Sequence, residues 1–375
     1  MPEDQTPWKV VQTQNSAEAE HLLNSIDENA SLVLVFASPK VDCENVAKRC
    51  HARWGQRVIG CTTAGEIGPQ GYGDHGLSIC AFAANTVISE TVCIKDLHHP
   101  NLTALAHWQR RCQGHLALSA APMHGIAILL CDGLCQCEEH LAAQIRSFVP
   151  DCPLIGASAG DDALFHQTGV LHQGAFASNQ ATLTWIASTQ VSFETLHLND
   201  FTPISDDMVI TKAQSSERTI SEIDGFNALE IYRKHLGDSK RALDINDFAM
   251  HSLMLTIGGK SFVRSVRSAT ADGTLIMHSA IDEGMLVRIG RTGPVLPSLQ
   301  ASIATATADP NHLGMLHFDC IHRRLELQRL NDLSAAHKLL QEGTAGGFVT
   351  YGEISEGLHV NQTCTGMRIR RASHG

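Results

Sequence analysis

Three cysteines stand within seven residues of this chain, Cys131, Cys135 and Cys137, in a C-x3-C-x-C pattern. They follow the apolar run 126–130, so the first thiol comes at the end of a predicted buried strand. Strand ends in α/β proteins are where functional sites tend to lie. Thiols this close together usually converge on a metal ion or form a disulfide. This segment is therefore the clearest chemical signal in the sequence.

Zinc is the metal that these ligands favour. Structural zinc usually takes four Cys or His ligands, of which the motif supplies three, and His140 is a candidate for the fourth. Alternative fourth ligands are a cysteine of a second copy of the chain, Cys152, His124 and Cys61. The competing interpretation is a strand-to-helix turn with three ordinary cysteines, because Asp132-Gly133 is itself a turn signal. Since zinc-bound sulfurs are thiolates that oxidants attack, a redox switch is a further hypothesis.

The composition narrows the class of protein. The chain has 375 residues, with 28 Lys and Arg against 39 Asp and Glu, and a net charge of −11. This acidic excess argues against a nucleic-acid partner. The N-terminus lacks the basic and apolar regions of a signal peptide, and no apolar run approaches the roughly 20 residues that a transmembrane helix needs. We therefore expect a cytoplasmic protein with no membrane partner, in a compartment where clustered cysteines act as ligands or redox sensors.

Short apolar runs rich in β-branched residues alternate with helical stretches in the first half of the chain. The length of these runs and the glycines beside several of them favour strands. The expected strands are 32–36, 58–59, 77–82, 86–94, 125–130 and 181–187. The expected helices are 17–26, 41–54, 102–116 and 137–148. Such alternation predicts an α/β layer architecture.

A second domain is expected from about residue 200, because the chain is too long for one typical core. It should begin with a helix over 227–236 that Gly237 terminates. We predict an N-terminal α/β layered domain over 25–200 and a C-terminal α+β domain over 201–370. The later elements expected are strands 250–257, 262–268, 274–280, 285–289 and 313–319, a helix over 333–341 and a hairpin-like region over 346–370.

A short pattern recurs along the chain. The segment 59–67, Ile-Gly-Cys-Thr-Thr-Ala-Gly-Glu-Ile, has a near copy at 155–161, Ile-Gly-Ala-Ser-Ala-Gly-Asp, and an echo at 350–354, Thr-Tyr-Gly-Glu-Ile. Each copy places a predicted strand end against a glycine turn followed by an acid. This suggests duplicated units that meet around one cleft, and chance similarity of short segments is the alternative.

These motifs resemble those of the FIST sensory family, whose members have an N-terminal and a C-terminal half. The resemblance rests, in this order along the chain, on residues 60–67, 153–161, 224–232, 263–265, 347–354 and 361–363. It extends over roughly residues 25–370. Without a fused kinase or cyclase domain, the chain is most similar to the stand-alone nitric-oxide-sensing haemoproteins of that family, the NosP branch.

The resemblance implies a cofactor and a partner. Proteins of that branch bind haem b, respond to nitric oxide and regulate a partner histidine kinase, and through it biofilm signalling. Such sensors are commonly homodimers. The C-x3-C-x-C element is also similar to a zinc-binding cysteine motif of that branch. Because the cysteines lie in the first half of the chain, we expect zinc to form an input separate from haem.

A haem sensor of this kind needs an axial ligand, usually histidine, in an apolar pocket. His235 lies in the last turn of the predicted helix 227–236, and His251 begins an apolar strand. Tyr232 is an alternative axial ligand, and Arg264 is a candidate partner for the haem propionates. The other candidates are Tyr351, Arg267, His278, His312, His317, His322 and His359. The absence of a C-x-x-C-H motif indicates that the haem is not attached covalently.

Two other classes of function compete. One is a FIST sensor of a non-haem ligand such as an amino acid, with Glu66, Asp161 and Glu353 lining its pocket. The other is an enzyme with Cys61 as the nucleophile. The sequence contains no P-loop, dinucleotide fingerprint or recognisable catalytic triad pattern. We therefore expect a sensor and not an enzyme.

Overall fold

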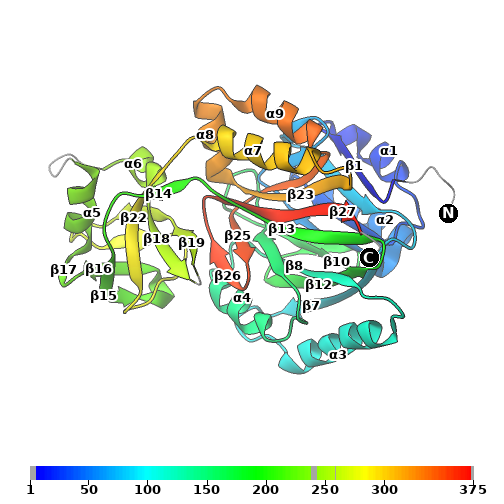
Figure 1. Ribbon diagram of the computed structural model, residues 1–375, viewed down its shortest axis with the longest axis horizontal. Helices are drawn as coiled ribbons and strands as arrows, with labels where there is room; N and C mark the ends of the chain where they lie inside the picture. The colour runs from blue at the N-terminus through cyan, green and yellow to red at the C-terminus, as the bar shows by residue number, and fades with distance from the viewer. Residues whose placement is uncertain (1–5, 238–242, 258, 373–375) are drawn as a thin grey trace.

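The computed structural model describes residues 6–237, 243–257 and 259–372. They form two bodies of unequal size that lie side by side (Figure 1). The larger, which we call the core, is built from residues 8–199 and 294–371. The smaller, which we call the inserted lobe, is built from residues 201–292. The chain thus leaves the core after Asn199 and returns to it after Thr292.

Within the described residues, the core contains three six-stranded sheets with the same plan. Each has two parallel central strands, with two antiparallel strands on one side and a hairpin on the other. The first sheet has the order β1 (Trp8–Thr13), β6 (Leu77–Phe82), β2 (Leu32–Ala37), β3 (Val58–Thr62), β10 (Val170–His172), β11 (Ala175–Ala177). The second has the order β7 (Ile88–Lys95), β12 (Gln180–Ser188), β8 (His124–Cys131), β9 (Leu154–Ser158), β25 (Gly352–Ser355), β26 (Leu358–Val360). The third has the order β13 (Val191–Asn199), β27 (Thr363–Arg371), β23 (His312–Cys320), β24 (Ala345–Thr350), β4 (Glu66–Gly68), β5 (Gly71–Gly73).

The hairpin of each repeat completes the sheet of another repeat. Hairpin β4–β5 follows β3 along the chain but pairs with β24 of the third sheet. Hairpin β25–β26 follows β24 but pairs with β9, and hairpin β10–β11 follows β9 but pairs with β3. The exchange is cyclic, so each repeat depends on the other two. At each of the recurring segments 59–67, 155–161 and 350–354, the chain leaves its own sheet for the hairpin that joins another sheet. This shared plan confirms repeated units.

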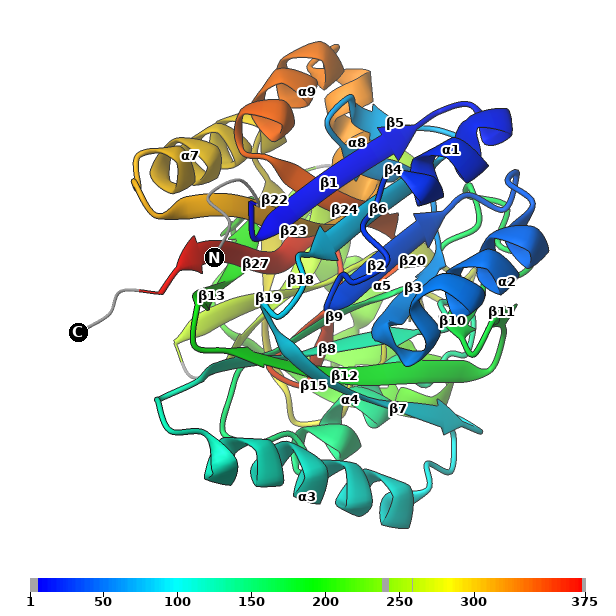
Figure 2. The same ribbon diagram turned by 90° about the vertical axis from the view of Figure 1, so that its right-hand side faces the viewer.

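Helices cover the outer faces of the three sheets (Figure 2). Each repeat has a helix after its first strand, namely α1 (Ala19–Asn24), α3 (Leu102–Leu118) and α7 (Val295–Thr307). Between the parallel strands lie α2 (Cys43–Trp54), α4 (Glu138–Arg146), and the pair α8 (Ile321–Arg329) and α9 (Leu333–Glu342). Two of these helices begin at side-chain caps, because Asp42 accepts the N–H of Asn45 and Asn101 accepts that of Ala104.

The inserted lobe is a nine-stranded sheet arrangement with two helices, as far as the described residues show. Its strands are β14 (Phe201–Pro203), β15 (Met208–Gln214), β16 (Thr219–Ile223), β17 (Phe226–Asn227), β18 (His251–Ile257), β19 (Lys260–Arg264), β20 (Val266–Ala269), β21 (Leu275–Met277) and β22 (Leu286–Thr292). Its helices are α5 (Ala228–Leu236) and α6 (Ile245–Met250). The predicted helix 227–236 is confirmed: Asn227 caps α5, and Gly237 ends it with φ 79°.

The mixed α/β architecture expected from the sequence is confirmed. The predicted hairpin-like region 346–370 is wrong as a single unit. Its strands β24 and β27 belong to the third sheet, whereas β25 and β26 complete the second. Residues on both sides of position 200 therefore share sheets, and only residues 201–292 form a body of their own.

Candidate ligand cavity between the core and the inserted lobe

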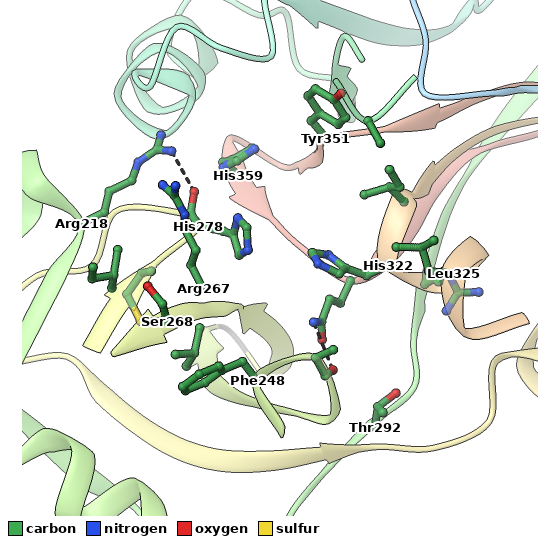
Figure 3. Close-up of a pocket in the computed structure, with 18 of the residues that line it drawn as sticks. Arg218, Phe248, Arg267, Ser268, His278, Thr292, His322, Leu325, Tyr351 and His359 are labelled. Carbon is green, nitrogen blue, oxygen red and sulfur yellow. Dashed lines mark hydrogen bonds between the residues drawn. The ribbon is translucent and has the colours of Figure 1, made fainter. Parts of the chain in front are cut away.

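A cavity of about 1290 Å³ lies between the core and the inserted lobe (Figure 3). Its volume exceeds the roughly 300–1,000 Å³ typical of small-molecule sites. The core contributes the loop 133–138, helix α8 and the hairpin β25–β26. The lobe contributes α6, β20 and the residues after β21. Because segments of both bodies form its walls, the cavity exists only in the folded arrangement of the two.

Two histidines face each other in this cavity. His278 follows β21 of the lobe, His322 lies in the first turn of α8 of the core, and their ring centroids are 5.4 Å apart. Burial, with smaller contributions from His322 and Arg267, lowers the pKa of His278 to about 3. Burial also lowers the pKa of His322 to about 4. Both imidazoles are therefore neutral at pH 7, the form that ligates metals and haem iron.

The rest of the wall is partly apolar and aromatic. Phe248 and Met277 of the lobe face the cavity, as does Leu325 of α8, which is 52% exposed. The rings of Phe165 and Tyr351 stack at 4.4 Å, and the Tyr351 hydroxyl donates a hydrogen bond to the Asp161 carboxylate. An extended planar ligand would find aromatic faces on this side.

Charged side chains of both signs also line the cavity. The arginines are Arg218, Arg267, Arg323 and Arg329, and the acids are Glu138, Asp200, Glu217 and Glu326. Arg323 is bound on both sides, because it donates to Asp319 at 2.6 Å and to Asp200. Arg267 is exposed and lies near His278 (Figure 3). Arginines in such positions suit carboxylate groups of a ligand.

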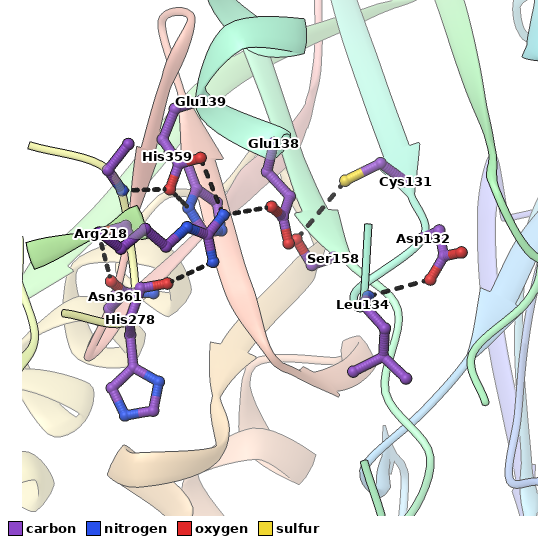
Figure 4. A network of polar contacts seen from close by, with 12 residues as sticks. Cys131, Asp132, Leu134, Glu138, Glu139, Ser158, Arg218, His278, His359 and Asn361 are labelled. Atoms are coloured by element: carbon purple, nitrogen blue, oxygen red, sulfur yellow. Dashed lines mark hydrogen bonds and ion pairs between the residues drawn. The ribbon is translucent and has the colours of Figure 1, made fainter. Parts of the chain in front are cut away.

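A buried polar network connects the two bodies beside the cavity (Figure 4). Arg218 of the lobe donates to Glu138 at 2.7 Å and to Glu139 at 3.0 Å, and both acids lie in the first turn of α4. Glu139 also accepts the N–H of Ala280 at 2.8 Å and contacts the ring of His359 at 3.2 Å. Burial by itself would raise the pKa of Glu139, but His359 and Arg218 outweigh it and lower that pKa. We call Arg218, Glu138 and Glu139 the latch.

Comparison with family models assigns the chain. The model of the FIST N domain matches residues 31–226, and that of the FIST C domain matches residues 228–356. The chain is a FIST protein. FIST domains are sensory domains of signal transduction, so the protein belongs to a sensory family. Comparison with curated proteins returns no match.

Three of the sequence-based haem candidates of this FIST protein, Tyr232, His235 and His251, do not line the cavity. Tyr232 is fully buried in the hydrophobic interior of the inserted lobe, and its hydroxyl donates to the carbonyl of His251 at 2.8 Å. His235 and His251 bring their Nδ1 atoms within 3.0 and 3.1 Å of backbone carbonyls, those of Ile231 and Asp247. Of the other histidine candidates, His278, His322 and His359 line the cavity.

Arg264, the expected propionate partner, is 4% exposed and lies outside the cavity wall. Within the described part of the chain, its Nε and Nη1 atoms have no hydrogen-bond partner. Burial lowers its pKa to about 10, and Glu139 opposes this shift. Arg264 therefore adds positive charge near Glu139, whereas Arg267 lines the cavity.

The cysteine motif adjoins the cavity, whereas the sequence suggested a separate position. Cys131 is fully buried, with its Sγ 3.5 Å from the Ser158 hydroxyl. The neighbouring thiol of Cys137, together with burial, raises the pKa of Cys135. His140 is exposed on α4. Among the described residues, no group of three or more His, Cys, Asp or Glu side chains is placed to hold a metal ion.

The acids expected to line a non-haem pocket have a structural role instead. Glu66 and Glu353 are fully buried and accept hydrogen bonds from the threonine three residues earlier, Thr63 and Thr350. Each also accepts a backbone N–H ten residues later. Asp161 accepts the N–H groups of residues 165–167. None of the three lines the cavity, and they hold the repeated turns in shape.

Cys61 does not have the environment of a nucleophile. Its thiol is fully buried in β3, and burial raises its pKa well above the ordinary value. A thiolate is the reactive form of cysteine, and it is disfavoured here. As for membrane insertion, none of the helices in the described part of the FIST protein has the length and apolar character to span a bilayer.

Proposed function

We propose that this FIST protein is a cytoplasmic haem-based sensor of nitric oxide that regulates a partner histidine kinase. The observation that carries the proposal is the pair of neutral histidines, His278 and His322, in a cavity large enough for a haem group. One of these histidines would hold the haem, which would supply an iron atom able to bind nitric oxide. The resemblance to stand-alone nitric-oxide-sensing FIST proteins supports the same ligand.

The residues of the cavity fit haem b in their chemistry. One of the two histidines would hold the iron, and Arg267, with Arg329 as an alternative, would pair with the propionates. Phe248 and Met277 exclude water from the apolar part of the wall, and the stacked Phe165 and Tyr351 rings provide an aromatic face. The cavity opens between two bodies, so its occupant touches both.

Hemin titration tests the proposal. We expect the purified FIST protein to develop a Soret band with hemin and to shift that band when nitric oxide is added. The variants His278→Ala and His322→Ala should identify the ligand, since at least one of them should lose the wild-type band. His235→Ala and His251→Ala are matched controls in the same lobe, outside the cavity. A Soret band that survives both cavity substitutions would overturn the assignment.

A second candidate is a non-haem ligand such as an amino acid. The cavity wall carries both negatively charged acids and positively charged arginines, and this favours a zwitterionic ligand. Thermal melts with single amino acids test it. A rise in melting temperature with an amino acid, together with no Soret band, would replace the haem proposal.

The zinc site and the homodimer are further parts of the proposal. Cys135 and Cys137 lie close to each other, and two further ligands, from this chain or from a second copy, would complete a four-ligand zinc site. Zinc content before and after treatment with hypochlorite tests a redox role, and unchanged content would refute it. Light scattering of the eluted protein tests the dimer. Phosphorylation of the partner kinase, with and without nitric oxide, tests regulation.

A further inference from the structure

Three consecutive residues link the cavity histidine to the latch, and we call residues 278–280 the strap. The N–H of His278 donates to the carbonyl of Ser265 at 2.9 Å, and its carbonyl accepts from Nη1 of Arg218 at 2.8 Å. The fully buried Ser279 hydroxyl donates to Asn361 of the core at 2.9 Å. The N–H of Ala280 donates to Glu139 at 2.8 Å. The backbone of His278 therefore cannot move without changing these hydrogen bonds.

If the strap moves, the buried side chains of the latch cannot readily exchange their ion-pair contacts for contacts with water. The side chains of Arg218, Glu138 and Glu139 are 16%, 4% and 15% exposed, so water replaces their contacts poorly. Both acids stand in the first turn of α4, and Arg218 lies just before β16 of the lobe. A break in this network removes an ionic connection between the two bodies. The buried guanidinium of Arg264, near Glu139, gives that acid a second cation within the same region.

The two chain crossings between core and lobe lie next to each other on another part of the cavity wall. Phe201 of β14 pairs with Thr292 of β22, and the N–H of Gly293 donates to the carbonyl of Asp200 at 2.7 Å. The carboxylate of Asp200 binds Arg323 of α8. Asp200, Phe201 and Thr292 all line the cavity. Two adjacent strands that join two bodies form a natural hinge.

We infer that the strap couples occupancy of the cavity to the arrangement of the two bodies. A ligand that binds at His278 shifts the strap, the strap changes the contacts of Ala280 and Arg218 with Glu139, and the lobe turns about the crossings at 200–201 and 292–293. Glu139 is then a positioning residue: it acts on the ligand through the strap and does not touch it. The inference rests on the proposed function in that His278 holds the ligand.

Hydrogen exchange of the haem-free protein tests whether the latch and the strap hold the lobe in place against the core. Glu139→Gln removes the negative charge that accepts hydrogen bonds from Arg218 and from the strap. We expect hydrogen exchange in peptides over 276–282, 199–204 and 290–296 to accelerate on the order of ten-fold. Asp207→Asn is the matched control, because the Asp207–Arg288 pair lies within the lobe and is exposed. A folded Glu139→Gln protein with wild-type exchange at these peptides would overturn the inference. If that variant does not fold, Arg218→Lys replaces it, because lysine keeps the positive charge but cannot donate to two carboxylates in the way the planar guanidinium does.

Hemin addition tests the coupling. In the wild-type protein, we expect hemin to change exchange at the first turn of α4, residues 138–141, and at the two crossings. His278→Ala should abolish this change. Hemin that binds without altering exchange at α4 would overturn the inference and leave the proposed function standing. Hemin that does not bind would overturn the proposed function, and the Glu139→Gln comparison alone would then decide whether the latch holds the lobe.

Discussion

The lowered pKa values of the cavity histidines predict how hemin affinity depends on pH. A histidine ligates iron only as the neutral imidazole, so protons compete with iron for its nitrogen. An ordinary histidine of pKa 6.5 is about 3% neutral at pH 5.0, which weakens its affinity for iron about thirty-fold relative to pH 7.5. His278, with a pKa of about 3, and His322, with a pKa of about 4, stay mostly neutral at pH 5.0.

We therefore expect the histidine contribution to hemin affinity to change by less than about two-fold between pH 7.5 and 5.0. The assay is transfer of hemin from the FIST protein to an excess of a haem-scavenging protein at each pH, followed in the Soret band. The double variant His278→Ala, His322→Ala gives the pH dependence that comes from the propionates and other groups. The ratio of wild type to double variant isolates the histidine contribution.

A thirty-fold fall of that ratio at pH 5.0 would refute the reasoning, because it would show that the ligand has an ordinary pKa. The protein must stay folded in the assay, and the same histidines act against this. The pKa values of these histidines in the folded protein lie below the value of a histidine in the unfolded chain. Their effect on the free energy of unfolding is therefore absent above pH 6.5, and stability is lost as the pH falls from 6.5 towards 4. Circular dichroism at both pH values therefore accompanies each measurement.

Substitutions outside the histidine pair separate structural roles from ligand binding. Tyr232→Phe should lower the free energy of unfolding by about 1–2 kcal/mol in denaturant titrations, because the buried carbonyl of His251 loses its donor, and should leave hemin affinity unchanged. Arg218→Ala removes the arginine that pairs with both Glu138 and Glu139, and should lower the free energy of unfolding by about 2–4 kcal/mol in the same titrations. Cys135→Ser should lower the zinc content of purified protein, and equal zinc in both proteins would contradict the zinc prediction.

The repeat plan shows what a sequence pattern can and cannot reveal. The segments 59–67, 155–161 and 350–354 share a glycine turn and an acid, and this was enough to indicate repeated units. Their acids were expected to face a cleft, yet Glu66 and Glu353 bind their own turns. A carboxylate near a glycine turn can serve either purpose, and only the direction of the chain after the turn decides between them.

The sequence analysis missed three helices, α6, α7 and α8, and the last two of them have physical reasons. Helix α7 contains Pro297 in its first turn and is rich in Ser and Thr, which lowers its helix propensity. Helix α8 begins directly after strand β23 at Cys320, without a polar side chain that caps it. Burial of residues such as Leu299 and Leu327 against the third sheet stabilises these helices where local signals are weak.

The sequence by itself determined the α/β class, the FIST family and the position of the cysteine motif at a strand end. Strand periodicity and motif order are local properties, so they can be read without coordinates. The cavity was decided by tertiary structure alone, because His278, His322 and Glu138 come from three distant segments. The lowered pKa values have the same origin, since they arise from burial between two bodies. His235 and His278 look alike in the sequence, and only packing separates a helix-end histidine from one that faces a ligand cavity.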